Sequence, residues 1–297
     1  MELAKLIEIL EKIAPPELAE DFDEGRIGLI LGFEKDIKKI AVALDATSYT
    51  LQKAADMKAD LLITHHTLIF RPINKISKAL AASLKLALEN ELSLYSMHTN
   101  YDRVEGGIND VLAARIGLKN LQSVESGRIG EIELCSSATL AAIVSESLQT
   151  PVIYNGEKNN IRRVMVVGGS GFRTEFLEIA RENKVDAFIS SELKHDILRM
   201  YEDLCLIDAT HYATENPGMD TLCPRLRELT GLEVEFIEQP SGLRVIDKSQ
   251  NLLKEEARPR KGEADSIETL LDKQLRNQVR SDYRRSLGSE NRRRYME

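Results

Sequence analysis

The chain has 297 residues, 42% of them hydrophobic and 30% charged, and its net charge at pH 7 is −8. That composition is typical of a soluble globular protein, and the length is close to the upper limit for a single hydrophobic core, so we expect two domains. No apolar run approaches the roughly 18 residues that a membrane helix needs, and the acidic, helical N-terminal stretch is not a signal peptide, which predicts a cytoplasmic protein without a membrane partner.

Short apolar strands alternate with amphipathic helices along most of the chain. In chain order we expect a helix at 3–13, a strand at 37–47, a helix at 48–59 with Ser48 as its N-cap, a strand at 60–66, a helix at 77–91, a strand at 92–98 and a helix at 106–118. The second half repeats the rhythm with a strand and glycine-rich turn at 162–171, a helix at 174–184 and strands at 186–192, 203–211 and 233–238. Such alternation predicts an α/β protein with parallel or mixed sheets covered by helices. Residues 119–160 lack this clarity and are a candidate for the domain junction.

The segment from residue 248 onward differs in composition. It holds 13 basic and 9 acidic residues, a net charge of +4, so the preceding body carries −12 and is a poor nucleic-acid binder. Residues 254–266 read as a charged linker, and after them an apolar residue recurs at every fourth position from Ile267 to Leu287. That single narrow stripe fits either a solvated, marginal helix or a helix that docks on a partner subunit.

Four of the five histidines are expected at the ends of strands. His65 and His66 end the apolar run "LLITHH", His98 follows "LSLYSM", and His211 follows "LCLIDAT". A single histidine in such a place is more often a hydrogen-bonded core residue than a ligand. In an α/β sheet, however, ligands collect at the C-terminal ends of the strands, and the coincidence of four histidines there indicates one shared site.

Two of these histidines are followed four residues later by a carboxylate, Asp102 after His98 and Glu215 after His211. On a helical turn, residues i and i+4 point the same way, so each pair could present a nitrogen and a carboxylate to one point. Imidazole and carboxylate suit Zn²⁺, Mn²⁺ or Fe²⁺, and the three cysteines lack the CxxC spacing of a zinc ribbon. Six candidate ligands exceed the need of one tetrahedral ion and suit two divalent ions roughly 3.5–4 Å apart, with a bridging carboxylate.

Three further features near the strand ends carry weaker signals. "GGSG" at 168–171 could cradle phosphate with backbone N–H groups, but it lacks the Lys-Ser/Thr of a P-loop, so a tight turn without cofactor is favoured. Glu192 could be a general base facing the metals. His195 fits a proton shuttle and a surface residue equally well.

The motifs together resemble the Nif-three-like family, whose members are often called GTP cyclohydrolase 1 type 2 homologues. "ADLLITHHTLIF", "SMHTNYDRVEGGINDVLA", "VMVVGGSG", "DAFISSELKHD" and "DATHYATENPGMDTL" stand in the family's order, and the resemblance covers residues 1–247. The family's aromatic-Asp-Asn opening is here Phe22-Asp23-Glu24. One departure is Thr67, where the family usually has the proline that fixes the turn after the paired histidines.

The resemblance implies two α/β domains, the second inserted into the first, with a dinuclear metal site in the cleft between them and a toroidal homohexamer. On this basis we expect a metal-binding domain at 1–120 plus 205–247, a second α/β domain at 121–204, and the linker and helical tail at 248–297. The family's ligands match His65, His66, Asp102, His211 and Glu215. His98 matches a histidine near the metals that ligates less regularly.

Two classes of function remain open. The first is a metal-dependent hydrolase that acts on a small molecule, with GTP ring opening suggested by the family name alone and with His98 or Glu192 relaying protons. The second is a non-enzymatic protein that binds metal for storage, delivery or regulation of a partner. Turnover of GTP with release of formate separates the two.

Overall fold

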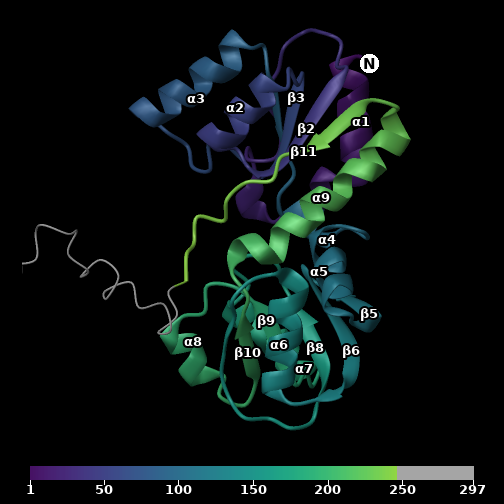
Figure 1. Cartoon of the computed structure of the whole chain (residues 1–297), viewed down its shortest axis with the longest axis vertical. Coiled ribbons are helices and arrows are strands. Elements are labelled where there is room, and N and C mark those ends of the chain that lie inside the picture. Colours follow the sequence, from purple (N-terminus) through teal and green to yellow (C-terminus); the bar gives the residue numbers. More distant parts are fainter. Residues whose placement is uncertain (246–297) are drawn as a thin grey trace, which may run out of the picture. The chain divides into compact units, whose positions relative to one another are not determined.

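The computed structural model of the chain describes residues 1–245, of which 1–243 form one compact unit containing two sheets (Figure 1). The linker and tail helix expected at 248–297 lie outside the described residues. Within the described part, no helix is both long and apolar enough to cross a membrane.

The first sheet has five strands in the order β1-β4-β3-β2-β11, of which all but the edge strand β1 run parallel. Helices cover both of its faces, with α1 and α9 on one side and α2 and α3 on the other. The elements are β1 Gly28–Leu31, β2 Lys39–Asp45, β3 Leu61–His66, β4 Ser93–Ser96, β11 Glu233–Phe236, α1 Leu3–Ile13, α2 Ser48–Asp56, α3 Lys78–Glu89 and α9 His211–Thr230.

Residue alternation along β2 explains how one strand serves two cores. Ile40 and Val42 enter the core beneath α1 and α9, whereas Ala41 and Ala43 enter the core beneath α2 and α3, because successive side chains of a strand point to opposite faces. The N-cap of α2 is Thr47 rather than the expected Ser48. Its hydroxyl accepts from the Thr50 backbone N–H in a capping box, which Ser48 cannot do from inside the first turn.

The second sheet has six strands in the order β5-β6-β8-β9-β10-β7, with β8, β9 and β10 parallel. Helices α5 and α6 pack on one face and α7 and α8 on the other. The elements are β5 Lys119–Val124, β6 Gly127–Cys135, β7 Ile153–Tyr154, β8 Ile161–Val166, β9 Ala187–Ser190, β10 Cys205–Asp208, α5 Ile108–Ile116, α6 Ser137–Leu148, α7 Thr174–Glu182 and α8 His195–Met200.

Two sequence expectations differ from this arrangement. Residues 119–160 are not a junction but an ordered hairpin, the helix α6 and the short strand β7, with Leu140, Val144 and Leu148 of α6 buried on one side. Strand β10, expected to begin the return to the first domain at residue 205, pairs with β9 and β7 in the second sheet. Its apolar side chains pack with those of β8 and β9, which is why it belongs there.

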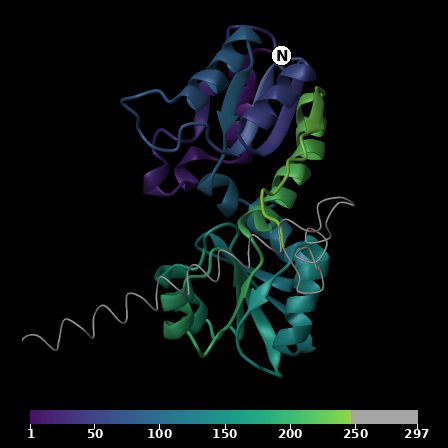
Figure 2. The same ribbon diagram turned by 60° about the vertical axis from the view of Figure 1, so that its left-hand side comes forward.

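The expected α/β class is confirmed, and the second sheet is inserted between β4 and β11 of the first. Helix α9 joins the two sheets, as the green helix in Figure 2 shows. Ala213 near its start belongs to the core of the second sheet, and Met219, Leu222 and Leu226 belong to the core of the first. The start of α9 is therefore fixed between the sheets.

A buried arginine fixes the connection that leads from the first sheet to the second. Arg128 of β6 is only 1% exposed, and its guanidinium binds Asp110 and donates to the carbonyls of Arg103 and Val104 at 2.8 and 3.1 Å. These contacts tie the second sheet to the segment that carries Asp102.

We predict that Arg128→Met lowers the free energy of unfolding by about 3–5 kcal/mol, because it leaves Asp110 and two carbonyls without their buried partner. Urea unfolding of the full chain measures this change. The matched control is Arg162→Met, which removes an exposed ion pair to Glu131 and is expected to change stability by at most about 1 kcal/mol. Equally small changes in the free energy of unfolding in both variants would contradict the role of Arg128 in fixing the connection between the two sheets.

Candidate metal centre

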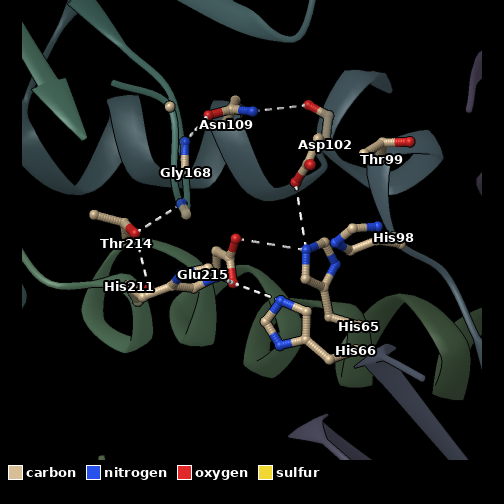
Figure 3. Close-up of polar contacts among 12 residues, drawn as sticks. His65, His66, His98, Thr99, Asp102, Asn109, Gly168, His211, Thr214 and Glu215 are labelled. Carbon is tan, nitrogen blue, oxygen red and sulfur yellow. Dashed lines mark hydrogen bonds and ion pairs between the residues drawn. The ribbon is translucent and has the colours of Figure 1, made fainter. Parts of the chain in front are cut away.

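The centre forms where the C-terminal ends of strands from both sheets meet (Figure 3). His65 and His66 end β3, and His98 follows β4 as the N-cap of α4, Thr99–Arg103, which carries Asp102. His211 and Glu215 lie on the first turn of α9, after β10. Both i/i+4 pairs expected from the sequence therefore start helices.

Glu215 is the carboxylate that contacts most of the centre. Its Oε1 lies 3.7 Å from His65 Nε2, and its Oε2 lies 3.3 Å from His66 Nε2 and 3.1 Å from His211 Nε2. Asp102 Oδ1 lies 3.7 Å from His65 Nε2 on the other side. Donor atoms around a tetrahedral ion with bonds of about 2.0–2.1 Å stand about 3.4 Å apart, so these separations are those of ligands to shared cations.

The possible ligand atoms fall into two overlapping groups. His65, His66 and His98 form one, and His66, His211 and Glu215 form the other, each with ligand atoms within 4.8 Å of one another. Both groups include His66.

Several polar atoms of the centre are buried without a hydrogen-bond partner in the described part of the chain. They are both ring nitrogens of His65, Asp102 Oδ1, His211 Nε2 and Glu215 Oε2. Buried polar atoms in folded proteins are almost always paired, so a group of orphans that face one another fits a site whose partner is an ion. The residues present therefore fit a metal centre.

The electrostatics of the centre favour cations. Burial lowers the pKa of His65 to about 4, which keeps the ring neutral and able to ligate. Burial and the nearby charge of Glu215 raise the pKa of Asp102 well above its usual value. Burial would also raise the pKa of Glu215, but His65 and His66 outweigh it and lower that pKa. Two buried carboxylates thus compete for the same positive charge, which a divalent ion would supply.

Three histidines are oriented by carboxylates that bind their other ring nitrogen. His66 Nδ1 lies 2.6 Å from Asp45 Oδ1, and His98 Nδ1 lies 2.8 Å from Asp23 Oδ1. His211 Nδ1 lies 2.6 Å from Glu192 Oε1. Such contacts fix the ring and its tautomer, leaving Nε2 free to ligate, and they are typical of metal-binding histidines.

Sequence reasoning assigned no role to Asp45 or Asp23, and it placed Glu192 at the metals rather than behind His211. Asp45 had a detectable signal, since it ends β2 just as the histidines end β3. His195 begins α8 as an exposed residue and is in neither ligand group.

Two residues with positive φ stand beside His211. Thr210 has φ 65° and ψ 145°, a combination that only glycine adopts freely, and Glu192 has φ 64°. Each such residue costs of order 1–3 kcal/mol, and strain of this kind clusters at functional sites. Here the strained Thr210 precedes the first turn of α9, and the strained Glu192 carries the carboxylate that orients His211.

The glycine N–H groups of the turn after β8 support the centre rather than cradling phosphate. The N–H groups of Gly168, Gly169 and Gly171 donate to Asn109 Oδ1, Thr214 Oγ1 and Ser190 Oγ at 2.7, 3.0 and 2.9 Å. They are therefore already engaged, as Figure 3 shows for Gly168. A Cβ on Gly169 would lie 2.1 Å from Glu215 Oε1, so only glycine lets the carboxylate occupy its place.

Comparisons with known proteins found similar sequences and structures. The family model of Duf34/NIF3 (NGG1p interacting factor 3) matches residues 1–241. Proteins called GTP cyclohydrolase 1 type 2 homolog are similar: that of Clostridium perfringens is 33% identical over 80% of this chain and 95% of its own length, and that of Methanocaldococcus jannaschii is 32% identical over 79% and 98%.

Solved structures are similar as well. Reduced HcgD from Methanocaldococcus jannaschii superposes with a TM-score of 0.71 and 31% identity, over 80% of this chain and 98% of that one. The protein ybgI, of unknown function, superposes with a TM-score of 0.75 and 26% identity, over 81% and 99%. The resemblance noted in the sequence is confirmed.

We predict that Gly169→Ala lowers the metal content of the purified protein, because the new methyl group displaces Glu215. Elemental analysis after dialysis against Mn²⁺ or Zn²⁺ measures the change. Gly156→Ala is the matched control: Gly156 has a similar φ of +76° but no atom within 4 Å of an added Cβ, so the backbone cost is the same and the centre is untouched. Equal metal content in the two variants would show that Gly169 does not constrain Glu215.

Proposed function

The chain belongs to the Duf34/NIF3 family, and from this premise we propose that it is a hydrolase that uses two divalent metal ions, Zn²⁺, Mn²⁺ or Fe²⁺, held by His65, His66, Asp102, His211 and Glu215. The observation that carries the proposal is that Glu215 offers a different oxygen to each of two donor sets. His65 Nε2 stands beside Oε1 and also beside Asp102, and His66 and His211 stand beside Oε2. A carboxylate shared in this way is the usual bridge of a two-metal site.

Two such ions, when bound, polarise a substrate and lower the pKa of water toward neutrality, which makes hydrolysis the natural reaction class. The protein positions the ligand rings for this task. Asp45 and Glu192 hold His66 and His211 with Nε2 toward the shared carboxylate. Glu192 therefore acts through His211, and we assign it a positioning role in place of the proton relay expected from the sequence.

His98 is the residue best placed to move a proton. It lines a pocket beside the cluster, and Asp23 accepts the proton of its Nδ1, which leaves the Nε2 lone pair free. Burial would raise the pKa of Asp23, but the hydrogen bonds from His98 and Thr99 outweigh it and lower that pKa, so the carboxylate stays charged beside the ring. A histidine backed by a buried carboxylate is the usual general base of hydrolases.

The substrate that we propose is a nucleotide, with GTP ring opening as the first reaction to test, because the relatives carry the name GTP cyclohydrolase 1 type 2 homolog. The homohexamer implied by the sequence resemblance remains a prediction. Light scattering on the full chain measures it.

We predict metal-dependent release of formate from GTP, measured with Mn²⁺, Zn²⁺ and Fe²⁺ supplied in turn, followed by other nucleotides and phosphodiesters. Asp102→Ala should abolish turnover because it removes a donor from the centre. Asp56→Ala, which loses only a hydrogen bond to Gln52 on exposed helix α2, should not change it. Full activity in Asp102→Ala would place the active site elsewhere. Absence of turnover across the panel, with rapid exchange of the bound metal, would favour a carrier or regulatory protein instead.

We also predict that His98 and Glu192 affect different properties. His98 belongs to one of the two groups of possible ligand atoms but is not one of the five ligands that we propose, whereas Glu192 orients the proposed ligand His211. His98→Ala should lower kcat by about 10²–10⁴-fold while most metal remains, because general acid–base assistance contributes that much. Glu192→Gln should instead weaken metal affinity by about 10–100-fold, because it loosens His211. Metal titrations and kcat at saturating metal separate the two effects. A loss of metal affinity in His98→Ala together with a loss of kcat alone in Glu192→Gln would contradict the roles that we assign to these residues.

A further inference from the structure

A small pocket lies beside the metal centre, and one of its lining residues is Arg173, a positively charged side chain that is not part of the centre. Its volume is about 80 Å³, and it is lined by four residues of the cluster, His98, Asp102, His211 and Glu215. Arg173, Ser170 and Ser126 line it as well. Sites that enclose a whole ligand measure about 300–1,000 Å³, so this pocket suits one substituent of a substrate.

Arg173 is held in place from two sides. Its Nη2 donates to Glu20 Oε1 at 3.1 Å, and its guanidinium carbon stands 4.5 Å from the centroid of the Phe176 ring. Its Nε is buried and has no hydrogen-bond partner among the described residues. The guanidinium thus has a fixed plane, and at least one donor remains for a ligand.

Glu20 is shared between two arginines. It lies 3.6 Å from Arg103 Nη2 as well as 3.1 Å from Arg173 Nη2, and Arg103 Nη2 also lies 3.9 Å from Glu125 Oε2. The backbone N–H of Glu20 donates to Thr99 Oγ1 at 2.8 Å, which anchors this segment to the helix that carries Asp102. Arg173 therefore brings a guanidinium into a pocket that is also lined by the carboxylates of Glu20, Asp102 and Glu215.

We propose that Arg173 and Ser170 form a subsite that binds a phosphoryl group of the substrate while the bond to be hydrolysed lies at the metal centre. The subsite rests on the proposed hydrolase and names the class of its substrate, a phosphorylated small molecule. The planar fork of arginine matches phosphate oxygens, and the divalent ions proposed for the centre, when bound, would add positive charge beside it that favours a dianion over a carboxylate. The pocket is too small to enclose a nucleobase together with its phosphates, so the remainder of the substrate lies outside it.

Glu20 competes for this subsite. It occupies the terminal nitrogens of Arg173, which a phosphoryl group would need. Neutralising Glu20 should therefore strengthen anion binding, whereas removing Arg173 should weaken it. A purely structural ion pair predicts that both changes act in the same direction.

The test is isothermal titration of the metal-loaded full chain with inorganic phosphate. Arg173→Met should weaken phosphate binding by about 10–100-fold, which is the contribution of hydrogen bonds to a charged group. Glu20→Gln should tighten it. Arg199→Met, which removes an exposed arginine paired with Glu202 on α8, should leave it unchanged. Metal content and the unfolding midpoint are measured for each variant, and Arg173→Lys replaces Arg173→Met if the latter does not fold, with an affinity below that of the wild type.

Unchanged phosphate affinity in a metal-loaded Arg173 variant would overturn the subsite, because the phosphate would then be bound by the metals alone. Weaker phosphate binding in Glu20→Gln would contradict the competition between Glu20 and phosphate for Arg173. Acetate that binds as tightly as phosphate would overturn the phosphoryl assignment. The titration does not require turnover, so its outcome is independent of the proposed hydrolase activity. Phosphate affinity that depends on Arg173, without turnover, would support the subsite and contradict the hydrolase. Turnover with a phosphate affinity that does not depend on Arg173 would support the hydrolase and contradict the subsite.

Discussion

The centre of this protein depends on one buried carboxylate, Glu215, which contacts histidines from both halves of the fold. Its side chain is 4% exposed, and a charge so placed is stable only when positive groups surround it. His65 and His66 arrive from the first sheet and His211 from its own helix, while Asp102 adds a second negative charge. This excess of buried acceptors explains why the site fits cations rather than a simple ion-pair network.

The two sheets provide the geometry that this carboxylate needs. In each sheet the parallel strands direct their C-terminal ends toward the same region, and the residues after β3, β4, β8, β9 and β10 all reach it. Helix α9 is buried against both cores, so its first turn cannot shift without disturbing either sheet. The ligands lie at the ends of rigid elements, and they are consequently positioned before any metal binds.

Unusual backbone geometry and close packing occur at this junction. Thr210 and Glu192 adopt positive φ, and Gly169 approaches Glu215 so closely that no side chain is possible there. The Glu20–Arg173 pair links the N-terminal segment to the turn after β8 across the same region. Strain and close approach of this kind are retained where a site requires them, so their presence beside Glu215 and His211 is consistent with the donor geometry.

The sequence by itself predicted many of the elements outside residues 119–160 and the candidate ligands, because hydrophobic periodicity and i/i+4 spacing are local properties that survive without knowledge of the fold. Helix α1, strand β3 and the pairs His98–Asp102 and His211–Glu215 are of this kind. Only the tertiary structure decided which carboxylates orient the rings, because Asp23 and Asp45 reach His98 and His66 across 75 and 21 residues without any fixed spacing. It also decided that β10 joins the second sheet and that Arg173 faces the cluster, since strand order and contacts between loops depend on how the whole chain packs.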